Sequence, residues 1–204
     1  MRRSIGMAAM MAVAMLAGCA SPPAPDQVRL TAPPGLALPL PGRVLVQMSE
    51  PTLAARLVDN DPLSSGDGAP EGAALERAAV GVLGRAFRGV AVNRPDIDPQ
   101  VVTRITGSAK IRHPSGRVQV TCVVDAVKAN GDTIGYFFNH YRSAPVMGLD
   151  AALPGIFGQC LKKPVEQLLA SKQIRDLAAA GFPAPDRGAA DAYLRSQGYV
   201  IAGP

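Results

Sequence analysis

The fold is decided by the stretch from residue 118 to residue 141, which has the sequence VQVTCVVDAVKANGDTIGYFFNHY. Before Asn130-Gly131, apolar residues occupy every second position, and a period of two residues is typical of a β-strand. Asn and Gly tolerate the positive backbone angles that a two-residue type I′ turn requires. The stretch therefore predicts a β-hairpin with its turn at Asn130-Gly131.

Both faces of this hairpin carry apolar side chains. The predicted cross-strand partners are Val124 and Phe137, Cys122 and Asn139, and Val120 and Tyr141 on one face, and Val123 and Phe138, and Thr121 and His140 on the other. We expect the first face to pack against helices. The second face carries too many apolar groups for a fully solvated surface.

A third strand precedes the hairpin. The tetrapeptide His113-Pro114-Ser115-Gly116 has the composition of a turn, so residues 101–142 are expected to form a three-stranded antiparallel meander. Upstream, alternating apolar residues predict a strand over residues 43–48 and a short strand over residues 90–92.

A helix is predicted between those two strands. Apolar residues at helical spacing indicate an amphipathic helix from Gly72 to about Arg88. Residues 52–59 fit either a short helix or an edge strand.

A long helical pattern covers residues 149–179. Pro164 interrupts it, because proline lacks the amide that would pair with the carbonyl of Cys160, so we expect a kink or two helices there. A short helix at residues 189–195 and an extended segment at 199–201 follow. The element order predicts an α+β domain, with a mostly antiparallel sheet and two main helices packed on one face.

Cys122 and Cys160 are both expected to face the core, one from a strand and the other from the helix that covers it. An even pair of cysteines in an exported chain permits a disulfide. The alternative is two reduced cysteines that act as small buried apolar residues.

The N-terminus has the features of a secretion signal. Arg2 and Arg3 precede an uncharged apolar run over residues 5–16. Such a run is too short to span a bilayer, which needs about 20 residues. We therefore expect a cleaved leader and not a membrane span.

The run Leu16-Ala17-Gly18-Cys19 resembles the lipobox of bacterial lipoproteins. The resemblance covers about the first tenth of the chain. It implies cleavage before Cys19, a diacylglycerol thioether on its sulfur and, commonly, a third acyl chain on the new amino group. Two or more acyl chains hold a protein firmly on a membrane without spanning it. The alternatives are that the apolar run is a buried core helix, or that the ordinary signal peptidase cleaves the leader and Cys19 stays unmodified.

The predicted organisation is a signal peptide at 1–18, lipidated Cys19 with a Pro-rich tether at 19–42, and a single periplasmic domain at 43–204. A polyproline II tether rises about 3.1 Å per residue and could hold the domain roughly 60–70 Å from the lipid. In the lipoproteins that the lipobox resembles, an aspartate after the cysteine retains many enteric members at the inner membrane. Ala20 stands at that position here, so the resemblance favours the outer membrane, facing the periplasm. The periplasmic face of the inner membrane and the cell surface stay open as alternatives.

Composition argues against nucleic-acid binding. The net charge is +5, and without Arg2 and Arg3 the chain keeps 19 basic and 16 acidic side chains. The chain has five Phe, four Tyr and no Trp, which leaves few rings for base stacking.

No metal, cofactor or catalytic motif is expected. His113 and His140 are the two histidines, and no short Cys/His motif accompanies them. Ser108 lacks the glycine pattern of a hydrolase nucleophile. Asp96 and Asp98 alone supply too few oxygens for calcium.

A candidate partner-docking face lies on the first predicted helix, formed by Arg77, Gly81, Gly84, Arg85 and Arg88. Glycine inside a helix costs about 1 kcal/mol relative to alanine, so two glycines on one face indicate close approach by another surface. The partner would be an acidic protein or anionic headgroups. The alternative is a solvated face whose glycines pack against a neighbouring loop.

The element order and the tethered N-terminus resemble small envelope lipoproteins that assist transport or assembly machines, including auxiliary lipoproteins of envelope ABC transporters. That resemblance implies a lipid-anchored, non-enzymatic accessory protein that binds another envelope protein. The alternatives are a self-assembling structural or secretion-pore component and, third, an envelope enzyme.

Overall fold

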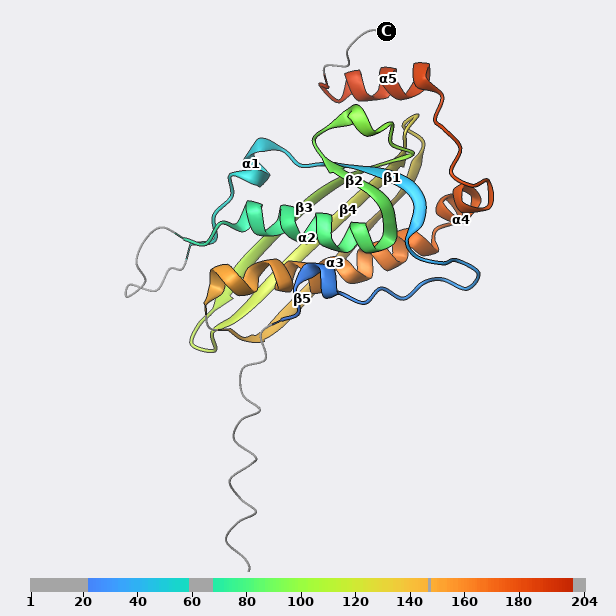
Figure 1. Cartoon of the computed structure of the whole chain (residues 1–204). Coiled ribbons are helices and arrows are strands. Elements are labelled where there is room, and N and C mark those ends of the chain that lie inside the picture. Colours follow the sequence, from blue (N-terminus) through green and yellow to red (C-terminus); the bar gives the residue numbers. More distant parts are fainter. Residues whose placement is uncertain (1–21, 59–67, 147, 200–204) are drawn as a thin grey trace, which may run out of the picture.

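The structure is a computed structural model that describes residues 22–58, 68–146 and 148–199. Its strands form one five-stranded sheet in the order β2-β1-β3-β4-β5 (Figure 1). The strands are β1 (Leu40–Gln47), β2 (Phe87–Val92), β3 (Val101–Arg112), β4 (Arg117–Lys128) and β5 (Thr133–Pro145). The helices are η1 (Pro25–Gln27), α1 (Glu50–Leu53), α2 (Glu71–Ala86), η2 (Pro95–Ile97), α3 (Leu149–Ala170), α4 (Lys172–Ala179) and α5 (Arg187–Ser196).

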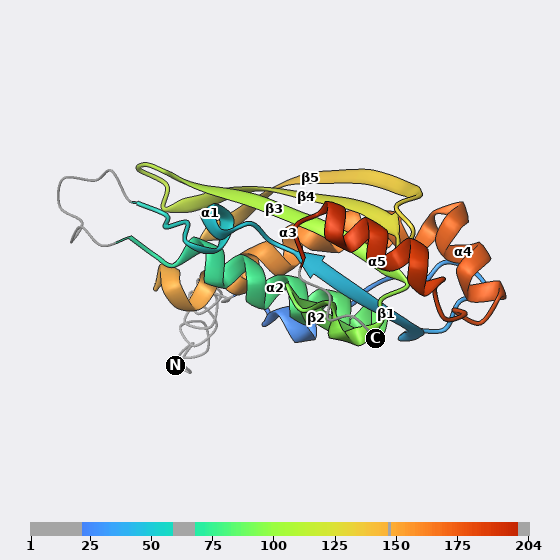
Figure 2. The same cartoon turned by 90° about the horizontal axis from the view of Figure 1, so that it is seen from above.

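The predicted α+β class is confirmed, but the sheet is mixed and not mostly antiparallel. β1 pairs in parallel with both β2 and β3, whereas β3, β4 and β5 pair antiparallel. The difference arises because α2 carries the chain back along the sheet, so β2 starts at the same end as β1. Figure 2 shows β3, β4 and β5 as one layer, with α2 and α3 on the same side of it.

The predicted hairpin register is confirmed: Val124 lies opposite Phe137 and Cys122 opposite Asn139. The turn itself differs from the expected two-residue form. Lys128 donates its amide to the carbonyl of Asp132 at 2.8 Å, and Gly131 has φ of 89°. A three-residue loop with a left-handed glycine is the next commonest hairpin connection, and a bulge between Ala126 and Val127 restores the register.

Pro164 does not divide the long helix, contrary to the expectation. α3 continues through Pro154 and Pro164 and ends before Ser171, whose hydroxyl then caps α4. The carbonyl of Cys160, which loses its helical partner to Pro164, accepts a hydrogen bond from Nδ2 of Asn139 on β5 at 3.0 Å. The sheet thus supplies the donor that the proline removes.

The first helix ends earlier than predicted. α2 stops at Ala86, and Phe87 starts β2 with its side chain fully buried. Arg88 consequently lies on a strand. The start of the ambiguous segment at 52–59 is helical, because α1 ends at Leu53 within it. The hydroxyl of Ser49 caps α1. Residue 59 lies outside the described residues.

The expected free tether is wrong for residues 22–42, which pack on the domain. Pro25 and Val28 are buried, and η1 lies across α2 and α3 (Figure 1). Three glycines allow this approach, because a side chain at any of them would crowd the docked segment. A Cβ added at Gly81 would lie 2.7 Å from Pro25, and a Cβ added at Gly155 would lie 2.6 Å from the carbonyl oxygen of Pro23. A Cβ added at Gly158 would lie 3.2 Å from Val28. Described residues before the predicted domain start at residue 43 therefore pack against the domain, including Leu30, Leu36 and Leu38, which are partly buried against its core.

Glu166 on α3 holds the docked N-terminal segment at a second point, Thr31. Its Oε1 accepts the amide of Thr31 at 2.7 Å and pairs with Lys162 at 2.5 Å. Burial alone would raise the pKa of Glu166, but the hydrogen bonds from Lys162 and Thr31 together hold it below its ordinary value.

Gly81 and Gly84 offer a matched test of the docked segment. Gly84 has open space around its Cβ position, so Gly84→Ala should stabilise the fold by up to about 1 kcal/mol through helix propensity. Gly81→Ala should instead destabilise by about 1–2 kcal/mol, because its methyl group displaces Pro25 and exposes part of Val28. Thermal unfolding followed by circular dichroism measures both. Equal effects of the two substitutions would contradict docking of this segment.

Glu71 joins the helix layer to the sheet. It is 8% exposed at the start of α2, and its Oε1 accepts the amide of Ala109 on β3. Burial raises the pKa of Glu71, an effect that the hydrogen bond from Ala109 only partly offsets.

Glu71 should make the stability of the wild type depend on pH in a defined direction, and replacing it with glutamine should remove that contribution. A raised folded pKa gives stability that is present below the unfolded pKa, about 4.3, and is lost as the pH rises through the folded value. Glu71→Gln keeps an acceptor without the charge, so it should exceed the wild type in stability at pH 7, and this advantage should shrink near pH 4.

The measurement is the thermal midpoint of both proteins between pH 4 and pH 7. Glu71→Ala serves as control, because it leaves the Ala109 amide without an acceptor and should lose about 1–3 kcal/mol. A glutamine variant whose advantage grew as the pH fell would refute this account of Glu71.

Candidate functional site

Cys19, the predicted lipidation site, lies outside the described residues. The described chain starts three positions later at Pro22, which contacts Gly155 on α3. Among the described helices, none is both long and apolar enough to cross a membrane.

Cys122 and Cys160 form a disulfide that joins β4 to α3. Their Cα atoms are 6.0 Å apart, and both side chains are completely buried. The structure thus decides between the two alternatives that the sequence left open, in favour of the bonded pair.

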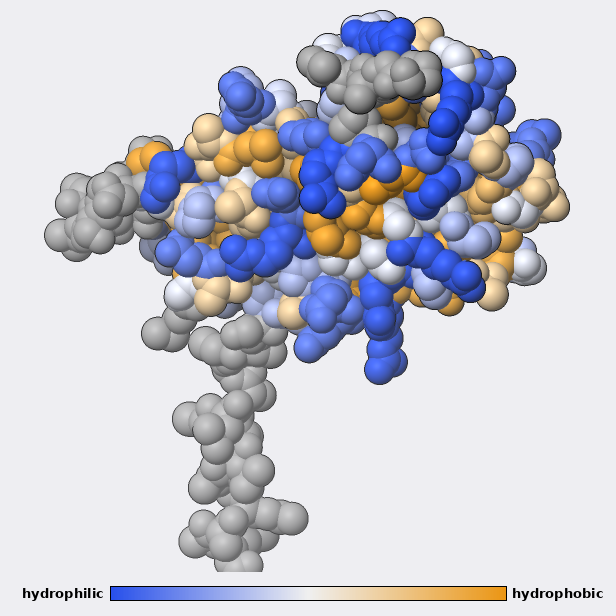
Figure 3. Space-filling view, turned by 45° about the horizontal axis from the view of Figure 1, so that its top comes forward, coloured by the Kyte–Doolittle hydropathy of each residue, from blue (hydrophilic) through white to orange (hydrophobic). Residues whose placement is uncertain are grey.

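The five residues of the predicted docking face do not form one free surface. Gly81 is covered by Pro25 of the same chain, which matches the alternative of a glycine packed against a neighbouring loop. Arg88 belongs to β2, while Arg77, Gly84 and Arg85 stay exposed on α2. Figure 3, which views the molecule from between the front and the top of Figure 1, shows apolar patches bordered by hydrophilic side chains.

A larger free surface lies on the sheet face opposite α2 and α3, which we call the outer face. α5 covers one end of it, where Leu194 packs on Leu45 and Val102. No described element covers the remainder, over β3, β4 and β5. Tyr136 and Phe138 on β5 are 65% and 56% exposed, so the open part includes large apolar groups.

The edge of the sheet beside these rings is also open in the described chain. β5 is the last strand of the sheet and has 13 residues. A hollow of about 360 Å³ follows this edge, lined by Tyr136, Phe137, Phe138, Asn139, His140, Lys163 and Gln167. A long unpaired edge is a template for pairing with a further strand.

The histidines do not form a metal site in the described residues. Nδ1 of His140 lies 2.8 Å from Oγ1 of Thr121, and its ring meets Phe138 edge-on at 5.8 Å. His113 lies in the β3–β4 turn. Within the described ranges, no three His, Cys, Asp or Glu side chains gather closely enough to bind a metal ion.

The remaining sequence candidates are dispersed. Ser108 is exposed on β3. Asp98 has a left-handed backbone with φ of 47° and lies 3.7 Å from Arg187, at the base of α5.

Sequence analysis missed a basic hollow at the turn end of the outer face. It has a volume of about 420 Å³ and is lined by Arg112, Ser115, Arg117, Arg142 and Pro145. Arg112 and Arg142 are 30 positions apart in the sequence, and the pairing of β3, β4 and β5 brings the arginines together. Arg112 lies opposite Arg117, and Arg142 lies opposite Gln119. Extending the predicted strand pairing of the meander to the ends of its strands would have placed these three arginines next to one another.

Comparison with known proteins gives neither a family nor a curated relative. No protein-family model matches the chain, and no curated protein matches it. A Xanthomonas campestris protein of family DUF330 has a similar structure, with 17% identity, a TM-score of 0.43 and coverage of 70% of this chain and 89% of that chain.

The PelC dodecamer of Paraburkholderia phytofirmans is similar at 13% identity and a TM-score of 0.37, over 66% of this chain and 96% of that chain. A single-residue variant of PelC gives 15% identity, a TM-score of 0.36 and coverage of 65% and 92%. Similarities at this level establish no function for the chain.

Proposed function

We propose that the protein is a lipid-anchored accessory protein of the bacterial cell envelope, attached through Cys19 and facing the periplasm at the outer membrane. It acts by binding another envelope protein and assists a transport or assembly complex. The observation that supports the proposal is the sequence Leu16-Ala17-Gly18-Cys19, which resembles a lipobox and ends three residues before Pro22, a residue that lies against Gly155 on α3.

This position determines how the domain would sit on the membrane. Three residues reach at most about 10–11 Å, so an acylated Cys19 would hold the domain against the bilayer. The separation of roughly 60–70 Å expected for a free tether would require residues 22–42 to leave α2 and α3.

The outer face and the β5 edge supply the binding surface. Tyr136 and Phe138 stand beside a free strand edge, and a partner strand could pair with β5 while its side chains contact both rings. His140 is hydrogen-bonded to Thr121 on the same open surface. We accordingly assign it to binding and propose no catalytic step.

Photo-crosslinking tests this function in cells that produce the full chain. A benzoylphenylalanine at Phe138 should yield one adduct of defined size, identified by mass spectrometry as an envelope protein. The same probe at Val80, which is 41% exposed on α2, is the matched control and should give no such adduct. Equal labelling from both positions, or none from Phe138, would refute the assignment.

A second candidate is a self-assembling component, favoured by the two sheet edges at β2 and β5, with which no other described strand pairs. β5 of one copy could then pair with β2 of the next in a head-to-tail assembly. In this case the Phe138 adduct would contain a second copy of the chain, and the detergent-extracted protein would elute as an oligomer.

A further inference from the structure

The hollow formed by Arg112, Arg117 and Arg142 concentrates positive charge. All three guanidinium groups are exposed at one end of the outer face. Oε1 of Gln119 accepts from Nε and Nη2 of Arg112 at 3.0 and 2.8 Å, which holds this side chain over the sheet. In the described part of the chain, no carboxylate pairs with any of the three arginines.

This arrangement is unfavourable without a counter-charge. Arg112 and Arg117 lie directly opposite each other across β3 and β4, and like charges in that position repel. An anion between them would remove the repulsion. The planar guanidinium group suits phosphate, since it donates two parallel hydrogen bonds to its oxygens.

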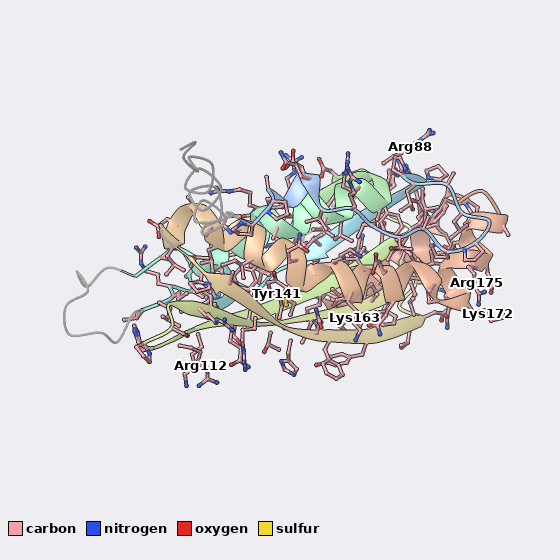
Figure 4. The ribbon with its side chains drawn as sticks, turned by 90° about the horizontal axis from the view of Figure 1, so that it is seen from below. Arg88, Arg112, Tyr141, Lys163, Lys172 and Arg175 are labelled. Atoms are coloured by element: carbon pink, nitrogen blue, oxygen red, sulfur yellow. A yellow bond between two sulfur atoms is a disulfide. The ribbon has the colours of Figure 1, made fainter. Side chains whose placement is uncertain are left out.

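The hollow lies at the end of the domain where the chain arrives from Cys19. Pro22 and Pro23 contact Gly155, within the first two turns of α3, and α3 starts only four residues after Pro145, which lines the hollow. Figure 4 shows Arg112 at one end of the sheet and Lys172 and Arg175 at the other. The 22 residues of α3 span about 33 Å between these ends.

We propose that this hollow binds the phosphate groups of lipid headgroups in the membrane that holds the acyl chains. The proposal rests on the proposed lipid anchor at Cys19. The domain then stands with the β3–β4 turn on the bilayer surface. The Tyr136 and Phe138 region of β5, farther along the strand, stays free for a protein partner.

The test uses the lipidated full chain, reconstituted into vesicles that carry a nitroxide on a fraction of the headgroups. The chain has no Trp, so one introduced Trp provides the only Trp fluorescence. Ser115→Trp places the probe at the hollow, and Pro145→Trp, at another residue that lines it, provides a second probe should the first variant fail to fold. Arg175→Trp on α4 is the control at the far end.

In phosphatidylglycerol vesicles, quenching of the Trp at 115 should exceed that of the Trp at 175 by about twofold or more, and it should weaken at high salt. Adding Arg112→Gln and Arg142→Gln should remove the excess. Phosphatidylcholine vesicles should give a smaller excess, since they lack net negative charge.

The outcomes separate this proposal from the anchor. If the chain stays on the vesicles but the excess quenching is the same with and without the two arginine substitutions, the headgroup site is refuted and the anchor stands. If the wild-type chain washes off the vesicles, the anchor fails and the headgroup proposal falls with it.

Discussion

Removing the disulfide between Cys122 and Cys160 should lower the free energy of unfolding by about 4 kcal/mol. The bond closes a loop with a sequence separation of 38, and the chain-entropy relation gives about this value for a loop of that length. Both sulfurs lie in the core between β4 and α3, so the bond also fixes the helix on the sheet.

The measurement is thermal unfolding of the full chain with and without a thiol reductant, beside the double variant Cys122→Ala/Cys160→Ala. The reduced wild type and the double variant should unfold at similarly lowered midpoints. The double variant serves as its own control, because a reductant should not shift its midpoint. Unfolding of the wild type that ignores the reductant would contradict the disulfide.

The variant Phe157→Ala should cost about 3–5 kcal/mol, the range for deleting a fully buried aromatic ring. Phe157 is completely buried on α3. A Cβ on Gly107 of β3 would meet Phe157 at 3.0 Å and Leu75 of α2 at 3.1 Å, so the ring fills the space where both helices meet the sheet.

Phe138→Ala is the matched control, because it removes the same phenyl ring from the outer face of the sheet and not from the core. Phe138 is 56% exposed, so the loss should stay below about 1 kcal/mol, mainly from β propensity. Chemical denaturation of both variants gives the comparison. Similar losses at the two positions would mean that the two sheet faces are not assigned correctly.

The sequence predicted the hairpin best because its information is local. Alternation and the Asn130-Gly131 turn placed Val124 opposite Phe137, and the structure agrees. The parallel pairing of β1 with β2 was missed although the predicted strand-helix-strand order favours it, since a helical crossover returns the chain to the end of the sheet where the first strand began. The parallel pairing of β1 with β3 depends on how the remaining strands pack, which is a tertiary property.

The errors at prolines have a common physical origin. Pro164 was expected to kink the helix or to divide it in two. The helix is not divided there, and Asn139, 25 positions earlier, supplies a donor to the Cys160 carbonyl. Pro22, Pro23 and Pro25 were expected to belong to a free spacer, but Gly81, Gly155 and Gly158, far along the chain, accommodate them. In both cases the compensating residue is close only after folding.

The candidate site was predictable in part. The apolar character of the second hairpin face followed from Val123 and Phe138, and the structure shows that face open over β3, β4 and β5. The docking face on α2 assumed that Gly81 was available, whereas η1 occupies it.

The intact mass of the protein extracted from bacterial membranes tests the central claim most directly. The account predicts a chain that begins at Cys19, lacks residues 1–18, and carries a diacylglycerol on the sulfur. A mass that retains the leader, or a Cys19 sulfur without lipid, would contradict it.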